Sequence, residues 1–148
     1  MSAVPGAVDG LLALMRTSAV LGADGVLICD GPWLHRPEEP DVVVIGWLPE
    51  EGPTVAWHST HASLRISDTS EEFTIQGLVS AWRGDTDMAS VRHRADELLE
   101  AVRVAVQLDQ TLGGSVATAQ LFTLSQAHWQ MEKGVEVPIQ FGIRARVF

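Results

Sequence analysis

Two histidines three positions apart are the residues whose types and spacing come nearest to a catalytic metal site. His58 and His61 lie in the segment H-S-T-H. Two imidazoles at this spacing can bind zinc from a turn or a helix, with Asp68 or His128 as a third ligand. Such a site would suit a small metal-dependent hydrolase. The segment lacks the general base of the His-Glu-x-x-His motif, so we favour exposed loop histidines that bind no metal.

Other catalytic patterns are absent from the sequence. There is no Gly-x-Ser-x-Gly elbow for a nucleophilic serine and no Gly-x-x-x-x-Gly-Lys loop for a phosphate. Gly113 and Gly114 follow a predicted helix instead of preceding one, which does not suit phosphate binding. The adjacent carboxylates Glu50–Glu51 and Glu71–Glu72 should point apart on an extended chain. We therefore predict no catalytic residue, no cofactor and no metal, and a protein that is not an enzyme.

Composition indicates one globular domain over residues 1–148. The chain is 46% hydrophobic, and its formal net charge is −9, with 19 acidic and 10 basic residues. A module that binds nucleic acid needs an excess of Lys and Arg to neutralise phosphates. The acidic balance excludes that class, although an acidic channel could let DNA slide through without binding.

Cysteine usage and hydropathy bear on the compartment. Cys29 is the sole cysteine, so no intrachain disulfide can form and we expect assembly in a reducing cytoplasm. Its apolar neighbours favour a buried, inert thiol. The first residues lack the basic region of a signal peptide. No apolar stretch approaches the roughly 20 residues that span a bilayer, so we expect no membrane association.

The first half of the chain predicts one helix and two strands. Apolar residues at helical spacing indicate an amphipathic helix over Ala7–Ala19, with Pro5 near its start and Gly22 past its end. Val26–Cys29 should form a short buried strand. The β-branched run Asp41–Trp47 should form a strand that is buried on both faces.

The middle of the chain predicts a hairpin, a loop and a further strand. Pro49–Pro53 is predicted as a solvated turn, with Thr54–Ser59 as the hairpin partner of the preceding strand. Ser67–Glu72 is predicted as a polar loop. Phe73–Trp82 alternates well enough to predict a strand with one apolar face.

The clearest element is a long helix over Asp87–Asp109. Asp87 can cap its N-terminus, and Gly113 can adopt the left-handed conformation that ends it. Its buried stripe should comprise Met88, Val91, Ala95, Leu98, Leu99, Val102, Ala105 and Val106. On the opposite side, helical spacing predicts the ion pairs Arg92–Asp96, Arg94–Glu97 and Glu100–Arg103.

The last segment alternates strictly between apolar and polar residues from Val135 to Val147. Pro138 lacks an N–H and therefore places this strand at an edge or a bulge. Together the elements predict an α+β fold: a mixed, mainly antiparallel sheet with two helices packed on one face.

Contact surfaces are predicted from tryptophans, loops and the polar face of the last strand. Tryptophan is enriched at interface hot spots, although core filling is the alternative interpretation for each. Long loops and a strand edge are further places for subunit contact. The candidate interface residues are Trp33, Glu50, Glu51, Trp57, Glu71, Glu72, Trp129 and Pro138.

The order of these elements resembles a known family. The segments are a "CDGPW" strand and turn, the strand "PDVVVIGW", and "EEFTIQGLVSAWRGDTD" running into "ASVRHRADELLEAVRVAVQLDQTLGG". With the first helix and the last alternating strand, they resemble the tail-terminator (tail completion) proteins of long-tailed bacteriophages, especially those of actinobacteria. The resemblance covers nearly the whole chain.

The resemblance implies a structural virion protein without an active site. It implies a homo-oligomer, a hexameric ring that caps the tail tube at its head-proximal end and stops polymerisation of the tube. The expected partners are the major tail tube protein, the neck or connector protein, and genomic DNA that passes through the lumen without specific binding. A neck or head–tail connector subunit is the neighbouring alternative, and a ligand-binding module a more distant one.

Overall fold

The computed structural model describes residues 3–23, 25–31, 41–48, 52–53, 55–61, 69–84, 87–131 and 134–147. For residues 47–48, 52–53, 55–61, 69–70 and 129–131 it describes the backbone alone. The helices are α1 (Val4–Arg16) and α2 (Met88–Leu108). The strands are β1 (Val26–Asp30), β2 (Asp41–Ile45), β3 (Trp47–Leu48), β4 (Gly52–Pro53), β5 (Val55–His61), β6 (Thr69–Arg83), β7 (Thr118–Gln126), β8 (Trp129–Met131) and β9 (Gly134–Val147).

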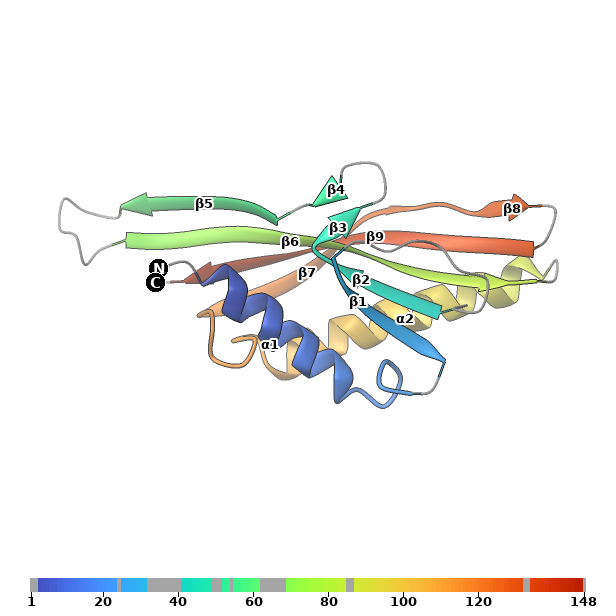
Figure 1. Cartoon of the computed structure of the whole chain (residues 1–148), viewed down its shortest axis with the longest axis horizontal. Helices are drawn as coiled ribbons and strands as arrows, with labels where there is room; N and C mark the ends of the chain where they lie inside the picture. Colours follow the sequence, from blue (N-terminus) through green and yellow to red (C-terminus); the bar gives the residue numbers. More distant parts are fainter. Residues whose placement is uncertain are drawn as a thin grey trace.

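One sheet organises the described chain, in the strand order β1-β2-β6-β9-β7. Among the described strands of this sheet, only the β1–β2 pair is parallel, and the other pairs are antiparallel. The long strands β6 and β9 run side by side along the molecule (Figure 1). β5 adds to β6 at one end, and β8 adds to β9 at the other. The predicted α+β class, with a mixed and mainly antiparallel sheet, is confirmed.

Both helices cover the same face of this sheet (Figure 1). The main core lies between them and the sheet, because alternate residues of β6 and β9 point toward the helices. A smaller apolar cluster lies on the helix-free face: Val42, Val44 and Leu78 are buried there, with Leu27 and Cys29 packed against them. This explains why all five residues of β2 are buried, as the β-branched run predicted.

The first helix forms three residues earlier than predicted. Pro5 lies in its first turn, where a missing N–H costs nothing, and the helix ends at Arg16. The Thr17 hydroxyl donates to the Leu14 carbonyl at 2.8 Å, and turns follow to Gly22. β1 forms where a buried strand was predicted, but it is the outer strand of the order and Val26–Cys29 are only half-buried.

The prediction for α2 is confirmed almost to the residue. The Asp87 side chain accepts a hydrogen bond from the Ser90 N–H, so Asp87 caps the helix as expected. Gly113 has a φ of 77° just beyond the helix end. The ion pairs Arg94–Glu97 and Arg103–Glu100 form, whereas no ion pair joins Arg92 to Asp96 within the described part of the chain.

Two predictions about the middle of the chain are wrong. β5 pairs antiparallel with β6, not with β2, whose neighbours are β1 and β6. Residues 69–72 are not a polar loop, because β6 begins at Thr69 and has β5 on one side and β9 on the other. Because Glu71 and Glu72 are polar, the sequence predicted a loop where the backbone of these two residues is paired with a strand on each side.

Pro138 does not mark a sheet edge. β9 is a central strand, and Pro138 pairs with Ser80 of β6. On the other side of β9, pairing passes from β7, which ends at Gln126, to β8. In this interval the Ala127 N–H donates to the Pro138 carbonyl at 3.0 Å. The missing N–H of Pro138 faces the same interval, where no regular ladder requires it.

Two glycines make room for aromatic rings close to the sheet, one on each face. Gly77 is opposite Phe141, and a Cβ there would lie 2.4 Å from the Val44 carbonyl oxygen and 2.9 Å from the Phe141 ring. Gly142 is opposite Phe122, and a Cβ there would lie 2.5 Å from that ring. Phe141 belongs to the main core, whereas Phe122 lies on the helix-free face.

Candidate interaction surfaces

Asp41 ties the sheet to the second helix. Its carboxylate is buried, and it accepts from Arg83 Nη1 of β6 at 2.7 Å and from Arg94 Nε of α2 at 2.9 Å. Arg94 also donates from Nη1 to Glu97 at 2.9 Å. One buried carboxylate therefore satisfies two cations from different elements and fixes where α2 crosses the sheet.

Arg94 remains charged at every accessible pH. Its partial burial, the largest single influence, acts to lower the pKa of the guanidinium. The hydrogen bond and charge of Asp41, followed by those of Glu97, outweigh burial and raise the pKa above its usual value. Any stability that follows from this shift would be lost only as the pH rises through the raised pKa.

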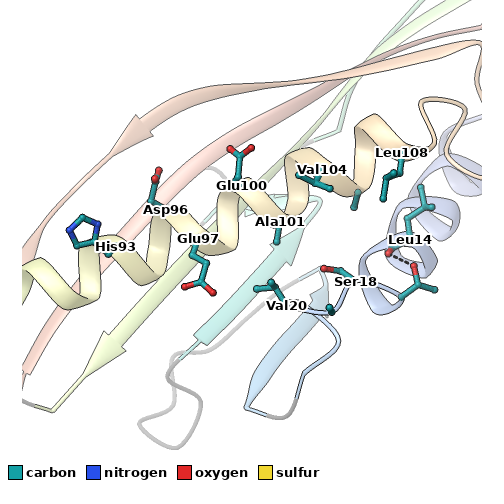
Figure 2. Close-up of a pocket in the computed structure, with 13 residues that line it drawn as sticks. Leu14, Ser18, Val20, His93, Asp96, Glu97, Glu100, Ala101, Val104 and Leu108 are labelled. Atoms are coloured by element: carbon teal, nitrogen blue, oxygen red, sulfur yellow. Dashed lines mark hydrogen bonds between the residues drawn. The ribbon is translucent and has the colours of Figure 1, made fainter.

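A hollow lies on the helical side of the molecule, where the end of α1 and the turn after it meet the outer face of α2 (Figure 2). We call it the helix groove, and its volume is about 630 Å³. Its apolar lining includes Leu14, Val20, Val104 and Leu108. Val104 is 43% exposed and Leu108 is 81% exposed, which is unusual for large aliphatic side chains.

Three carboxylates of α2 give the helix groove an acidic rim. Asp96, Glu97 and Glu100 line the groove: Asp96 and Glu100 project from one side of the helix, and Glu97 projects from the other side toward Val20 (Figure 2). No Lys or Arg is among its described lining residues. Arg94 and Arg103 pair with Glu97 and Glu100 from outside the lining, whereas Asp96 has no described ion pair. The end of the groove at Val104 and Leu108 is therefore apolar, and the other end is lined by carboxylates.

The helix-free face carries a surface of opposite character, which we call the arginine patch. It comprises Phe122 of β7, Arg144 and Arg146 of β9, and Glu72 of β6. The Arg144 guanidinium lies over the Phe122 ring, 5.6 Å from its centre. Glu72 Oε1 is 3.8 Å from Arg144 Nε, and Glu72 Oε2 is 3.4 Å from Arg146 Nη2. One carboxylate therefore pairs with two arginines, whose side chains are 64% and 51% exposed.

The predicted interface residues do not form one surface. Trp33, Glu50 and Glu51 lie outside the described residues. Trp57 pairs with Phe73 in β5 and Trp129 pairs with Glu136 in β8, and only their backbones are described. The remaining candidates, Glu71, Glu72 and Pro138, lie on adjacent strands, but only Glu72 belongs to the arginine patch.

Glu71 and Glu72 have different tasks. Glu71 Oε1 accepts from the Ala3 N–H at 3.0 Å, which anchors the start of α1 to β6. Glu72 belongs to the opposite face and to the arginine patch. Adjacent residues of a strand point to opposite faces, so the two carboxylates cannot share a proton or a ligand, as the sequence indicated.

The histidine segment belongs to a strand, not to the turn or helix on which a zinc site was predicted. Positions 58 and 61 are in β5, paired with Glu72 and Thr69. An odd spacing along a strand assigns two positions to opposite faces of the sheet, whereas the predicted site needs a turn or a helix. Asp68 lies outside the described residues, and His128 is hydrogen-bonded to Gln126 at 2.9 Å.

Neither a metal-binding cluster nor a membrane-spanning helix is found in the part of the chain that the structure describes. Among residues whose side chains are described, no three or more His, Cys, Asp or Glu gather as a metal site would require. No helix within the described ranges is long and apolar enough to cross a membrane.

The fold therefore defines an α+β protein with two contrasting surfaces on opposite faces of one sheet. Comparison with models of known protein families finds no match. A search of curated proteins finds no significantly similar sequence.

The sequence had signals for part of these surfaces. Val104 and Leu108 fall outside the buried stripe of α2, so their exposure could be foreseen from helical spacing. The sequence could not show that Arg83 and Arg94 both pair with Asp41, because this contact depends on how α2 crosses the sheet. The arginine patch depends equally on the register of β6, β9 and β7.

Proposed function

We propose that this chain is a structural subunit of a phage tail that assembles into a ring at the head-proximal end of the tail tube. In this position it ends polymerisation of the tube and joins the tail to the neck. The observation that carries the proposal is the exposed helix groove, where Leu108 is 81% exposed beside a row of carboxylates. Large exposed apolar side chains with a polar rim are typical of protein contact surfaces.

Three further features support an assembly role. The described sheet spans the molecule and has α1 and α2 on one face only, which leaves the arginine patch on the other face without a helix over it (Figure 1). The sequence resembles tail terminators over nearly its whole length. The net charge of −9 suits a ring whose lumen must pass DNA without holding it.

The experiment is tube assembly in vitro. The tail tube protein of the same virus is polymerised with and without this chain, and tube lengths and ends are measured by electron microscopy. We expect shorter tubes with a ring at one end. Tubes of unchanged length with no bound ring would contradict the proposal, and binding to the neck or connector protein instead of the tube would favour the connector alternative.

A further inference from the structure

The two contrasting surfaces have complementary chemistry. The helix groove combines exposed aliphatic side chains with three carboxylates and has no described Lys or Arg in its lining. Asp96 has no described ion pair, whereas Glu97 and Glu100 each pair with an arginine of the same helix. The arginine patch combines an aromatic ring with two arginines that share one carboxylate. The side chains of the two arginines are 64% and 51% exposed, so their guanidinium groups are accessible to a partner.

The arginine patch is held in place before any contact forms. Gly142 lacks a side chain, so the Phe122 ring lies against the sheet where a Cβ would be 2.5 Å away. The ring in turn supports the Arg144 guanidinium at 5.6 Å, and Glu72 orients Arg146. A cation stacked on a ring loses less conformational entropy when it binds a carboxylate.

Leu124 adds an apolar side chain to the same edge strand. It lies at the irregularity of β7 between Thr123 and Ser125 and is 42% exposed. The Ser125 hydroxyl donates to Gln140 at 3.2 Å, which fixes the strand beside Leu124. β7 therefore offers apolar groups beside the arginines of β9, and together they match the apolar and negative groups of the helix groove.

We propose that the helix groove of one copy of this chain binds the arginine patch of a second copy. Asp96, Glu97 and Glu100 would receive Arg144 and Arg146, and Leu108 would be covered by the β7 edge of the neighbour. The two surfaces lie on opposite faces of the sheet, so one contact cannot satisfy both surfaces of a subunit.

This geometry makes the contact head-to-tail. A head-to-tail contact leaves one free surface at each end of a chain of subunits, and closure into a ring satisfies both. The inference rests on the proposed ring and names the surfaces that form it.

Charge reversal with mixing tests the contact. One variant carries Asp96→Lys and Glu100→Lys, and the other carries Arg144→Glu and Arg146→Glu. Each alone brings like charges together, so we expect its self-association to weaken by about 100-fold or more. Mixed in equal amounts, the two variants present opposite charges at every contact, and we expect assembly to return with alternating subunits.

Two further variants keep the test independent of folding. Leu108→Gln changes a side chain that is already 81% exposed, so the fold should be unaffected, whereas self-association should weaken by about 10-fold. Arg92→Glu reverses an exposed charge of α2 that is not among the described lining of the groove, and it should leave assembly unchanged. Native mass spectrometry measures assembly for each protein, alone and with tail tube protein.

The outcomes separate this contact from the proposed ring. If the wild-type protein assembles and both reversed variants assemble equally well, the contact is overturned and the ring stands. If folded reversed variants fail alone and their mixture also fails, the contact is overturned. If the wild-type protein stays monomeric alone and with tail tube protein, the ring proposal fails and takes the contact with it.

Discussion

At the scale of single residues, Asp41 is the side chain on which the arrangement of α2 most depends. It is 6% exposed and has arginine partners at 2.7 and 2.9 Å. A buried charge that loses its partner costs more than the pair contributes. Removal of the Asp41 carboxylate would take the same acceptor from two arginines, Arg83 and Arg94.

We expect Asp41→Asn to lower the free energy of unfolding by about 1–3 kcal/mol, because two partly buried arginines lose their charged acceptor. Urea denaturation measures the change. Asp9→Asn is the matched control, since Asp9 is exposed on α1 and has no described ion pair, and it should change stability by less than about 0.5 kcal/mol. Equal effects of the two substitutions would contradict the role of Asp41.

Asp109 makes the helix end sensitive to acid. Hydrogen bonds from the Thr111 hydroxyl, then from the Gly113 and Thr111 N–H groups, lower the pKa of its carboxyl. A lowered pKa in the folded state contributes stability above the unfolded pKa, and that stability is lost as the pH falls through the folded pKa.

Asp109→Asn should therefore destabilise the protein at neutral pH and have less effect in acid. Thermal unfolding of both proteins over a series of pH values measures the gap between them. A gap that stays constant or widens as the pH falls would show that the charge of Asp109 does not hold the turn. Thr111→Val removes the hydroxyl that donates to the Asp109 carboxylate and should reproduce part of the effect.

At the scale of elements, the two glycine–aromatic pairs differ in what surrounds them. The space beside Gly77 is closed by the Val44 carbonyl of the neighbouring strand, which cannot move without breaking the β2–β6 ladder. At Gly142 the three atoms nearest to an added Cβ all belong to the Phe122 ring, which is half-buried and can rotate away.

Gly77→Ala should therefore cost about 1–3 kcal/mol of stability, as overpacking in a core does. Gly142→Ala should cost less, and in a Phe122→Ala background it should be neutral or stabilising, because alanine is favoured over glycine in a strand by about 0.5–1 kcal/mol. Chemical denaturation of the four proteins of the Gly142–Phe122 cycle measures the coupling. A larger cost for Gly142→Ala than for Gly77→Ala would contradict the account.

The sequence could predict elements that depend on local signals, but not the pairing of strands. α2 was predicted to within a residue because its cap, its stripe and its final glycine are all local signals. The partner of β5 was not, since strand pairing joins residues far apart in the chain. Of the two positions predicted from Pro138, an edge or a bulge, the edge is wrong, because its missing N–H is tolerated at an interruption between β7 and β8, a feature set by the neighbours of β9.

At the scale of the whole molecule, the chain places an apolar, acidic surface on one face of a sheet and a basic one on the other. Such a distribution disfavours two-fold dimers, in which each surface meets its own copy, and favours head-to-tail association. The interface residues named from the sequence stay a prediction. Of these residues Glu72 lies in the arginine patch, and the patch as a whole could not be read from the sequence because it depends on the register of β6, β9 and β7.

The most direct test of this account is the mass of the wild-type protein in solution, measured by native mass spectrometry over a range of concentrations, alone and with tail tube protein. We expect a closed oligomer with one fixed number of 16.0 kDa subunits, six if the resemblance to tail terminators holds. A 16.0 kDa monomer at every concentration, both alone and with the tube protein, would contradict it.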